Sequence, residues 1–137
     1  MKCKKITVRT QCVRIEHPLT GIGIWRSKDE EGNYLIDTMP SYERFCKRHE
    51  RFLTMYAEFY GSEYIGRKPK LLEEHFCAFK SIDQLLEWVL PKELKEMIEL
   101  DFRVYLIETS ECLEGEFQIA FRKEAIIEKK DITQLFK

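Results

Sequence analysis

The sequence predicts a single α+β domain in which two or three helices pack against a twisted, mainly antiparallel sheet. Three observations lead to this prediction. The chain of 137 residues is long enough for one hydrophobic core and too short for two. Hydrophobic residues make up 44% of it and aromatic residues 12%, which indicates a folded globular protein. Strand and helix patterns follow one another without a linker that would divide residues 1–137.

The first strand is predicted from the alternation of side chains. Residues 5–17 alternate apolar and polar side chains, which is typical of one long strand or two short ones. Residues 18–37 are predicted to form a loop, because glycines and a polar turn signal interrupt the pattern. At most a short strand is expected near residues 34–36.

A long helix is predicted over residues 41–60. Phe45, Phe52 and Phe59 repeat at every seventh position, which places them in one aromatic stripe along the helix. Gly61 follows as the expected end of the helix. Residues 61–74 are polar and broken by glycine and proline, so they are predicted to form a loop.

The second helical region is predicted over residues 82–99. Ser81 and Gln84 have the spacing of a capping box, in which each side chain bonds a free backbone amide at the helix start. Pro91 breaks this region and begins its last turns. The remaining strands are predicted at residues 75–79, 102–109, 116–122 and 125–136.

Composition narrows the classes of function. The 23 basic and 24 acidic side chains give a net charge of -1, so no overall field attracts the protein to nucleic acid or to an anionic membrane. Apolar runs are far shorter than the roughly 20 residues that span a bilayer. The five cysteines lack CxxC spacing, and we expect reduced thiols in a cytoplasmic protein without a metal site. Glu73, His75 and Cys77 are the nearest approach to a ligand set, and no second cluster completes them.

Residues 11–35 are the part of the chain richest in chemical groups. Arg14 and Glu16 alternate with apolar residues, so we expect them to point to solvent and to pair across one pleat. The loop that follows has glycines, which allow a backbone to approach a ligand, and an aromatic residue that offers a stacking face. This segment is the predicted binding site; its candidate residues are Arg14, His17, Gly21, Gly23, Trp25 and Tyr34.

Three segments occur in an order that resembles the small ADP-ribosyltransferase domains of phages and bacterial toxins. They are the strand with Arg14 and His17, the mid-chain FCAFKSIDQLLEWV, and the closing GEFQIAFRKEAI. The resemblance implies a split sheet with NAD as cofactor, in a groove between residues 14–26 and 116–118. It implies that Arg14 and His17 hold the dinucleotide beside the two loop glycines.

The resemblance also implies roles for four further residues. Trp25 or Tyr34 would stack on nicotinamide, and Glu116 or Gln118 would face the scissile glycosidic bond. Gln118 stands where the family has a catalytic carboxylate, and a neutral amide cannot stabilise a cationic ribose in the same way. A non-catalytic domain of this kind is therefore an open alternative.

Two alternatives to an enzyme follow from other segments. The first is a protein-binding inhibitor or adaptor from a phage or mobile element, because the helix at 41–60 has more aromatic residues than one buried stripe requires. The second is a nucleic-acid-binding module. Its phosphate contacts would come from two basic groups, Lys47, Arg48 and Arg51 on the helix and Arg67, Lys68 and Lys70 in the following loop. The oligomeric state is left open.

Overall fold

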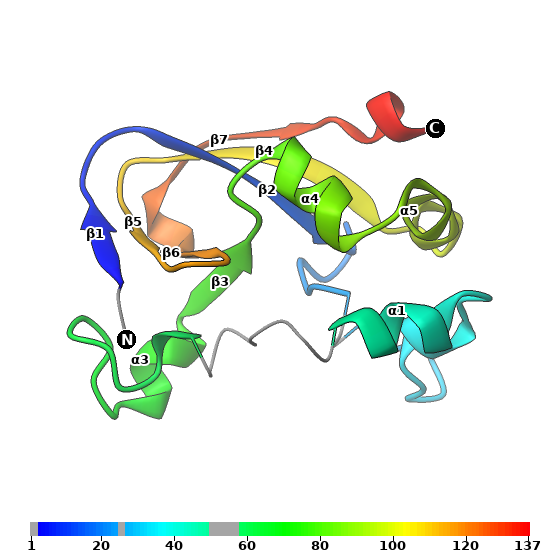
Figure 1. Ribbon diagram of the computed structural model, residues 1–137, viewed down its shortest axis with the longest axis horizontal. Coiled ribbons are helices and arrows are strands. Elements are labelled where there is room, and N and C mark those ends of the chain that lie inside the picture. The colour runs from blue at the N-terminus through cyan, green and yellow to red at the C-terminus, as the bar shows by residue number, and fades with distance from the viewer. Residues whose placement is uncertain (1–2, 25–26, 50–57) are drawn as a thin grey trace.

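Two antiparallel sheets hold the seven strands of the computed structural model, which describes residues 3–24, 27–49 and 58–137 (Figure 1). The strands are β1 (Lys4–Ile6), β2 (Thr10–Glu16), β3 (His75–Ala78), β4 (Arg103–Thr109), β5 (Cys112–Glu114), β6 (Ile119–Arg122) and β7 (Ile126–Asp131). One sheet has the order β1-β5-β6-β3 and the other the order β2-β4-β7.

A two-residue bridge joins the sheets. The amide of Val13 in β2 donates to the carbonyl oxygen of Phe79 at 2.9 Å, and the amide of Phe79 donates back at 2.7 Å. This bridge places β2 beside the end of β3, and β1 and β7 are the outermost strands of the two linked sheets. The predicted α+β class with a mainly antiparallel sheet is confirmed, with the sheet divided into two linked parts.

Four α-helices lie in the described part of the chain. They are α1 (Tyr42–His49), α3 (Pro69–Glu73), α4 (Ile82–Trp88) and α5 (Pro91–Glu99). The predicted cap of α4 is confirmed, because Oγ of Ser81 accepts from the amide of Gln84 at 3.1 Å. The side chain of Gln84 reaches back to the amide of Lys80 at 2.6 Å. Pro91 begins α5, as its position predicts.

Several predicted elements need correction. The loop expected at 61–74 contains α3, which Pro69 opens. The short strand expected near 34–36 is a 3-10 helix over Leu35–Thr38. Strand β5 lies between the predicted strands at 102–109 and 116–122, where no strand was predicted, because pairing with β1 and β6 outweighs its weak local pattern. The last segment is strand only over β7 and ends in a 3-10 helix, Thr133–Phe136.

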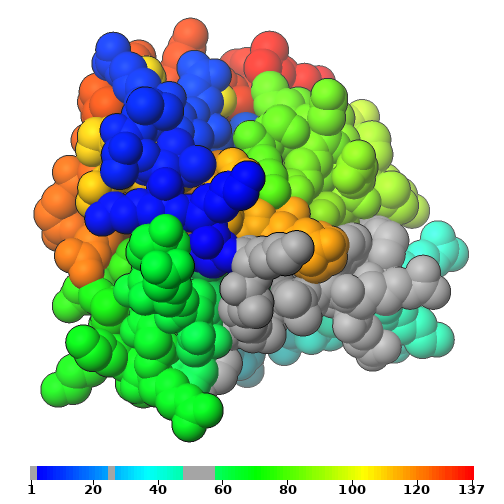
Figure 2. Space-filling model, turned by 60° about the vertical axis from the view of Figure 1, so that its left-hand side comes forward, coloured from blue at the N-terminus to red at the C-terminus, as the bar shows by residue number. Residues whose placement is uncertain are grey.

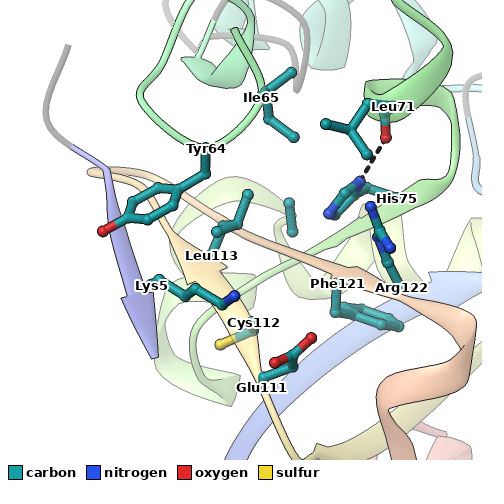
Figure 3. Close-up of a pocket in the computed structure, with 11 residues that line it drawn as sticks. Lys5, Tyr64, Ile65, Leu71, His75, Glu111, Cys112, Leu113, Phe121 and Arg122 are labelled. Atoms are coloured by element: carbon teal, nitrogen blue, oxygen red, sulfur yellow. Dashed lines mark hydrogen bonds between the residues drawn. The ribbon is translucent and has the colours of Figure 1, made fainter. Parts of the chain in front are cut away.

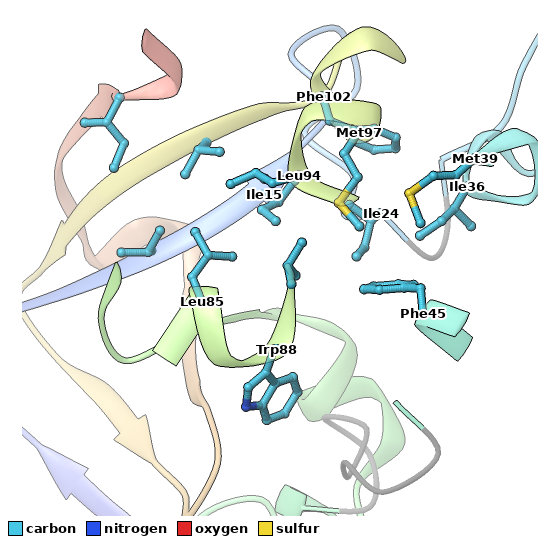
Figure 4. Close-up of a cluster of buried hydrophobic side chains, with 14 residues drawn as sticks. Ile15, Ile24, Ile36, Met39, Phe45, Leu85, Trp88, Leu94, Met97 and Phe102 are labelled. Carbon is cyan, nitrogen blue, oxygen red and sulfur yellow. The ribbon is translucent and has the colours of Figure 1, made fainter. Parts of the chain in front are cut away.

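The main core lies between the outer face of β2 and β4 and the helices α1, α4 and α5 (Figure 4). Val13 and Ile15 alternate into it from β2. Phe45 of the predicted aromatic stripe is fully buried there, whereas Phe59 belongs to a different cluster under β5 and β6. Phe52 lies outside the described residues, so the continuous helix at 41–60 stays a prediction.

The other two clusters lie on opposite faces of the β1-β5-β6-β3 sheet. The cluster around Cys12, Cys112 and Phe121 takes side chains from both sheets and fills the space between them. The cluster around Phe59, Leu72 and Leu113 packs the segment 58–73 against the far face. This second face carries the pocket described below.

Candidate functional site

Arg14, the cation that the ADP-ribosyltransferase resemblance assigns to NAD, is buried and bonded within the fold. Only 7% of the residue is exposed. Its Nε donates to Oε2 of Glu16 at 2.9 Å, and its terminal nitrogens donate to the carbonyl oxygens of Cys77 at 2.7 Å and Gly21 at 3.3 Å. The guanidinium carbon lies 4.9 Å from the ring centre of Phe76. Every nitrogen of this guanidinium therefore has a partner inside the protein.

Glu16 is the centre of a buried ion-pair network. It is 4% exposed, and it accepts from Nε of Arg14 and from Nζ of Lys129. The ammonium of Lys129 also lies 4.5 Å from the ring centre of Tyr105. We call Arg14, Glu16 and Lys129 the buried network. The predicted pairing of Arg14 with Glu16 is confirmed, but their predicted exposure is wrong, because β3 and β7 supply groups that cover this face.

The turn after β2 brings further predicted residues close to Arg14. Gly21 has a φ of +69°, which favours glycine, and its carbonyl oxygen is one of the two that Arg14 bonds. A Cβ at Gly23 would lie 3.6 Å from the guanidinium, in ordinary contact. His17 packs edge-on against Phe102 with ring centres 5.8 Å apart. The structure thus gathers Arg14, His17, Gly21 and Gly23 at one turn.

Three of the other predicted site residues, Tyr34, Glu116 and Gln118, lie farther along the chain. Tyr34 is 43% exposed and packs under Nζ of Lys28, 4.9 Å from the ring centre. Trp25 lies outside the described residues. Glu116 and Gln118 lie in the bend before β6 rather than in a strand, which corrects the predicted strand at 116–122.

This bend is held by a buried carboxylate. Oε2 of Glu58 accepts from the amide of Phe117 at 2.8 Å, and Gly115 leaves the space that this side chain needs. Glu116 is exposed and Gln118 is 6% exposed. The two candidate catalytic side chains therefore differ sharply in their access to solvent.

A pocket of about 180 Å³ lies on the face of the β1-β5-β6-β3 sheet that the segment 58–73 covers (Figure 3). Strand register explains which side chains meet there. Lys5 is opposite Leu113, which is opposite Ala120, so the three share this face. His75 is opposite Arg122, two residues further along the paired strands and on the same face.

The pocket combines an apolar floor with a polar rim. Ile65, Leu71, Leu113 and Ala120 form much of the floor. Lys5, Glu111 and Arg122 bring charges to the rim, and Tyr64 adds an aromatic side chain that is 37% exposed. At the surface, β1 in blue lies beside the green segment 58–73 and beside orange residues from later in the chain (Figure 2).

His75 is held in one orientation and one tautomer. Its Nδ1 lies 2.8 Å from the carbonyl oxygen of Leu71, which can only accept, so Nδ1 carries the proton. The remaining nitrogen, Nε2, is then an acceptor, and the ring lines the pocket. Burial lowers the pKa of His75, and the nearby Arg122 lowers it further, while the Leu71 carbonyl opposes both. The imidazole is therefore neutral at pH 7.

The two cations of the pocket are available to a ligand. Arg122 makes a long ion pair of 3.6 Å with Glu74, and both side chains are largely exposed, so this pair is weak. Lys5 makes no ion pair with any residue that the structure describes. Burial raises the pKa of the Cys112 thiol, which leaves it uncharged and unreactive as a nucleophile. The pocket therefore offers an anion two cations, which lie beside the carboxylate of Glu111.

Sequence reasoning considered His75 only as a metal ligand and did not single out Lys5 or Arg122. The three belong to strands separated by up to 117 positions, and only register brings them together. The available signal was that Lys5 and His75 begin predicted strands and Arg122 ends one. Basic residues at the ends of strands are common on protein surfaces. Nothing local in the sequence distinguishes these residues from other surface cations.

Three further findings concern metal ions, membranes and nucleic acid. In the described ranges, no group of three His, Cys, Asp or Glu side chains is arranged to hold a metal ion. No helix in those ranges is long and apolar enough to cross a membrane. Lys47, Arg67, Lys68 and Lys70 are exposed, and the side chains of Arg48 and Arg51 lie outside the description. Nucleic-acid binding stays a prediction.

Comparison with known proteins supplies a family. The model of the family described as Bacteriophage T4 Y00F protein matches residues 8–134. No curated protein matches the chain, and no solved structure does. The comparison gives no support to the resemblance to ADP-ribosyltransferases. Because the family model spans all but the first seven and the last three residues, the chain belongs to the bacteriophage T4 Y00F protein family.

Proposed function

We propose that this phage-family protein acts by binding another protein, and that its sheet-face pocket receives a carboxylate of that partner. The observation that carries the proposal is the pair of available cations, Lys5 and Arg122, above an apolar floor. A charged rim around an apolar centre is the usual composition of a site that anchors a partner residue.

The size of the pocket favours a single residue over a cofactor. Pockets for drug-sized ligands have volumes of about 300–1,000 Å³, and this one has about 180 Å³. A dinucleotide such as NAD exceeds that space. The adjoining hollow is larger, about 490 Å³, but Glu74, Glu111 and Glu124 line it and would repel the phosphates of a dinucleotide. One carboxylate-bearing residue fits it, and the rest of the partner would lie across the surrounding surface.

The charges around the pocket favour a protein partner over nucleic acid. Glu74, Glu111 and Glu124 lie around Arg122 in the adjoining hollow. These carboxylates would repel the successive phosphates of a nucleic acid, whose binding depends on many cation–phosphate contacts. A single carboxylate meets Lys5 and Arg122 without placing further negative charge near the acidic group.

The proposal is tested by nuclear magnetic resonance titration of the ¹⁵N-labelled full-length protein with short capped peptides. The first peptide has a single carboxylate on an internal glutamate, and the second has a single carboxylate at its free chain end. The third peptide has no carboxylate. We expect either charged peptide to shift the amide signals of β5, β6 and His75, with a Kd on the order of 1 mM or lower. The neutral peptide should leave them unchanged.

Matched variants locate the effect. Lys5→Gln and Arg122→Gln should each weaken binding of the charged peptide, because each removes a cation from the rim. Lys4→Gln and Lys123→Gln remove exposed cations next in the chain that do not line the pocket, and they should bind like the parent protein. Equal losses in all four variants would show a general charge effect and overturn the proposal.

A further inference from the structure

We propose that the carboxylate received by the pocket is the free carboxy terminus of the partner chain, with an apolar last side chain seated on the floor. This inference rests on the function proposed above. It goes beyond it by naming which carboxylate the pocket selects. Three features of the pocket support this choice over an internal acidic side chain.

The first feature is that the pocket offers donors and an acceptor together. Lys5 and Arg122 donate only, whereas Nε2 of His75 can only accept while the Leu71 carbonyl holds the proton on Nδ1. An aspartate or glutamate side chain brings acceptors alone. A chain end brings a carboxylate and, one Cα away, an amide N–H. It therefore satisfies both kinds of group, and burying His75 Nε2 without a donor would cost free energy.

The second feature is the apolar floor directly below the charged rim. Leu113 and Ala120 are 6% and 0% exposed, and Ile65 and Leu71 close the side formed by the segment 58–73. A terminal residue holds its side chain and its carboxylate on the same Cα. It can therefore place an apolar group on this floor while its carboxylate remains at Lys5 and Arg122. An internal glutamate has only methylene groups to fill the same space.

The third feature is the carboxylate of Glu111, which lines the same pocket. It would repel a ligand that is only an anion. A chain end presents backbone N–H groups beside its carboxylate, and one of them can donate to Glu111 as another donates to His75. Arg122 has to leave Glu74 to bind the ligand. The two exposed side chains are 3.6 Å apart, so breaking this ion pair costs little free energy.

The test compares three acetylated tripeptides on the full-length protein, by fluorescence anisotropy of a labelled peptide and by competition. The first ends in leucine with a free carboxylate, the second is its carboxamide, and the third is a carboxamide with a central glutamate. We expect the free acid to bind at least 10-fold more tightly than either carboxamide. Inorganic phosphate is the competing simple anion, and it should displace the free acid only weakly.

Variants add a second, independent readout. His75→Phe removes the acceptor while keeping an aromatic ring. It should therefore weaken binding of the free-acid peptide and leave binding of the glutamate peptide unchanged. Leu113→Ala enlarges the floor and should lower the preference for a terminal leucine. If either variant fails to fold, the three-peptide comparison on the parent protein still decides the question.

The outcomes separate the two proposals. If the glutamate peptide binds as tightly as the free acid, the chain-end inference is wrong and the carboxylate-binding function stands. If phosphate binds and neither charged peptide does, the pocket is a simple anion site and both proposals fail. If none of the probes binds at millimolar concentration, both fail as well.

Discussion

Two regions of this protein contain the same kinds of side chain and use them in opposite ways. The buried network places Arg14, Glu16 and Lys129 together, and each of these charges has an ion-pair partner inside the protein. The pocket places Lys5 and Arg122 at a surface where one has only a long, exposed partner and the other has none among the described residues. The difference teaches that a dense group of charges indicates a binding site only if the protein leaves those charges unpaired.

The largest expected effect comes from removing one member of the buried network. Arg14→Met leaves Glu16 with Lys129 alone and removes the donors of the Cys77 and Gly21 carbonyls. Breaking a buried ion pair in this way costs about 3–5 kcal/mol. We expect a loss of that size in the free energy of unfolding, measured with urea.

A matched surface pair provides the control for this variant. Nε of Arg9 lies 2.6 Å from Oε1 of Glu108, and the Arg9 side chain is 64% exposed. Arg9→Met should change stability by less than about 1 kcal/mol, since exposed pairs contribute little. Similar losses for the two variants would mean that the Arg14 side chain is solvated in solution and available to a ligand.

His75 lines the pocket but is buried like the buried network, and its effect on stability can be measured by changing the pH. Its pKa is lowered in the folded protein, so the unfolded chain takes up the proton first as the pH falls. Stability present above the ordinary value of 6.5 is therefore lost as the pH falls through that value toward the lower pKa of the folded state. Urea unfolding at pH 7.5 and 5.5 should show a steeper loss for the parent protein than for His75→Gln.

The cations of the pocket should contribute little to stability. Arg122→Gln removes one exposed ion pair, and we expect the free energy of unfolding to change by no more than about 0.5 kcal/mol. The same variant is expected to weaken peptide binding. A stability loss comparable with that of Arg14→Met would show that the fold depends on the contacts of Arg122, as it does on those of Arg14.

The smallest expected effect is the heat of binding when NAD is added to the protein. The guanidinium of Arg14 would have to leave its internal partners to contact a pyrophosphate. We therefore expect no saturable heat when the protein is titrated calorimetrically with NAD, and no release of nicotinamide. Saturable binding that Tyr34→Ala abolishes would restore the predicted groove. Release of nicotinamide would in addition make Glu116→Gln and Gln118→Ala the next variants.

Local signals predicted the elements whose causes are local. The side chains of Ser81 and Gln84 cap a helix because they lie three residues apart, and Pro91 begins the next helix because of its own ring. Strand β5 was missed because its three residues are held by β1 and β6, which are distant in sequence. The same reason explains the pair of Arg14 and Glu16, whose contact was predicted while its burial was not.

The candidate site was the part least accessible to sequence reasoning. The segment 11–35 attracted attention because several chemical groups lie close together along the chain. The pocket instead assembles Lys5, His75 and Arg122, whose neighbourhood depends on the register of four strands. Proximity in sequence was therefore a poor guide to which groups the protein leaves free.

The way the strands are shared between the two sheets has a consequence for synthesis on the ribosome. The chain passes from one sheet to the other at every strand connection except that from β5 to β6. Strand β1 cannot pair until β5 has been synthesised. Strand β2 likewise cannot form its ladder until β4 has been synthesised, or its bridge until Phe79 has been. Because these strands pair with partners far away in the chain, we expect nascent chains that end before β4 to lack a stable sheet. The second sheet should then be complete only once β7 has left the exit tunnel and pairs with β4.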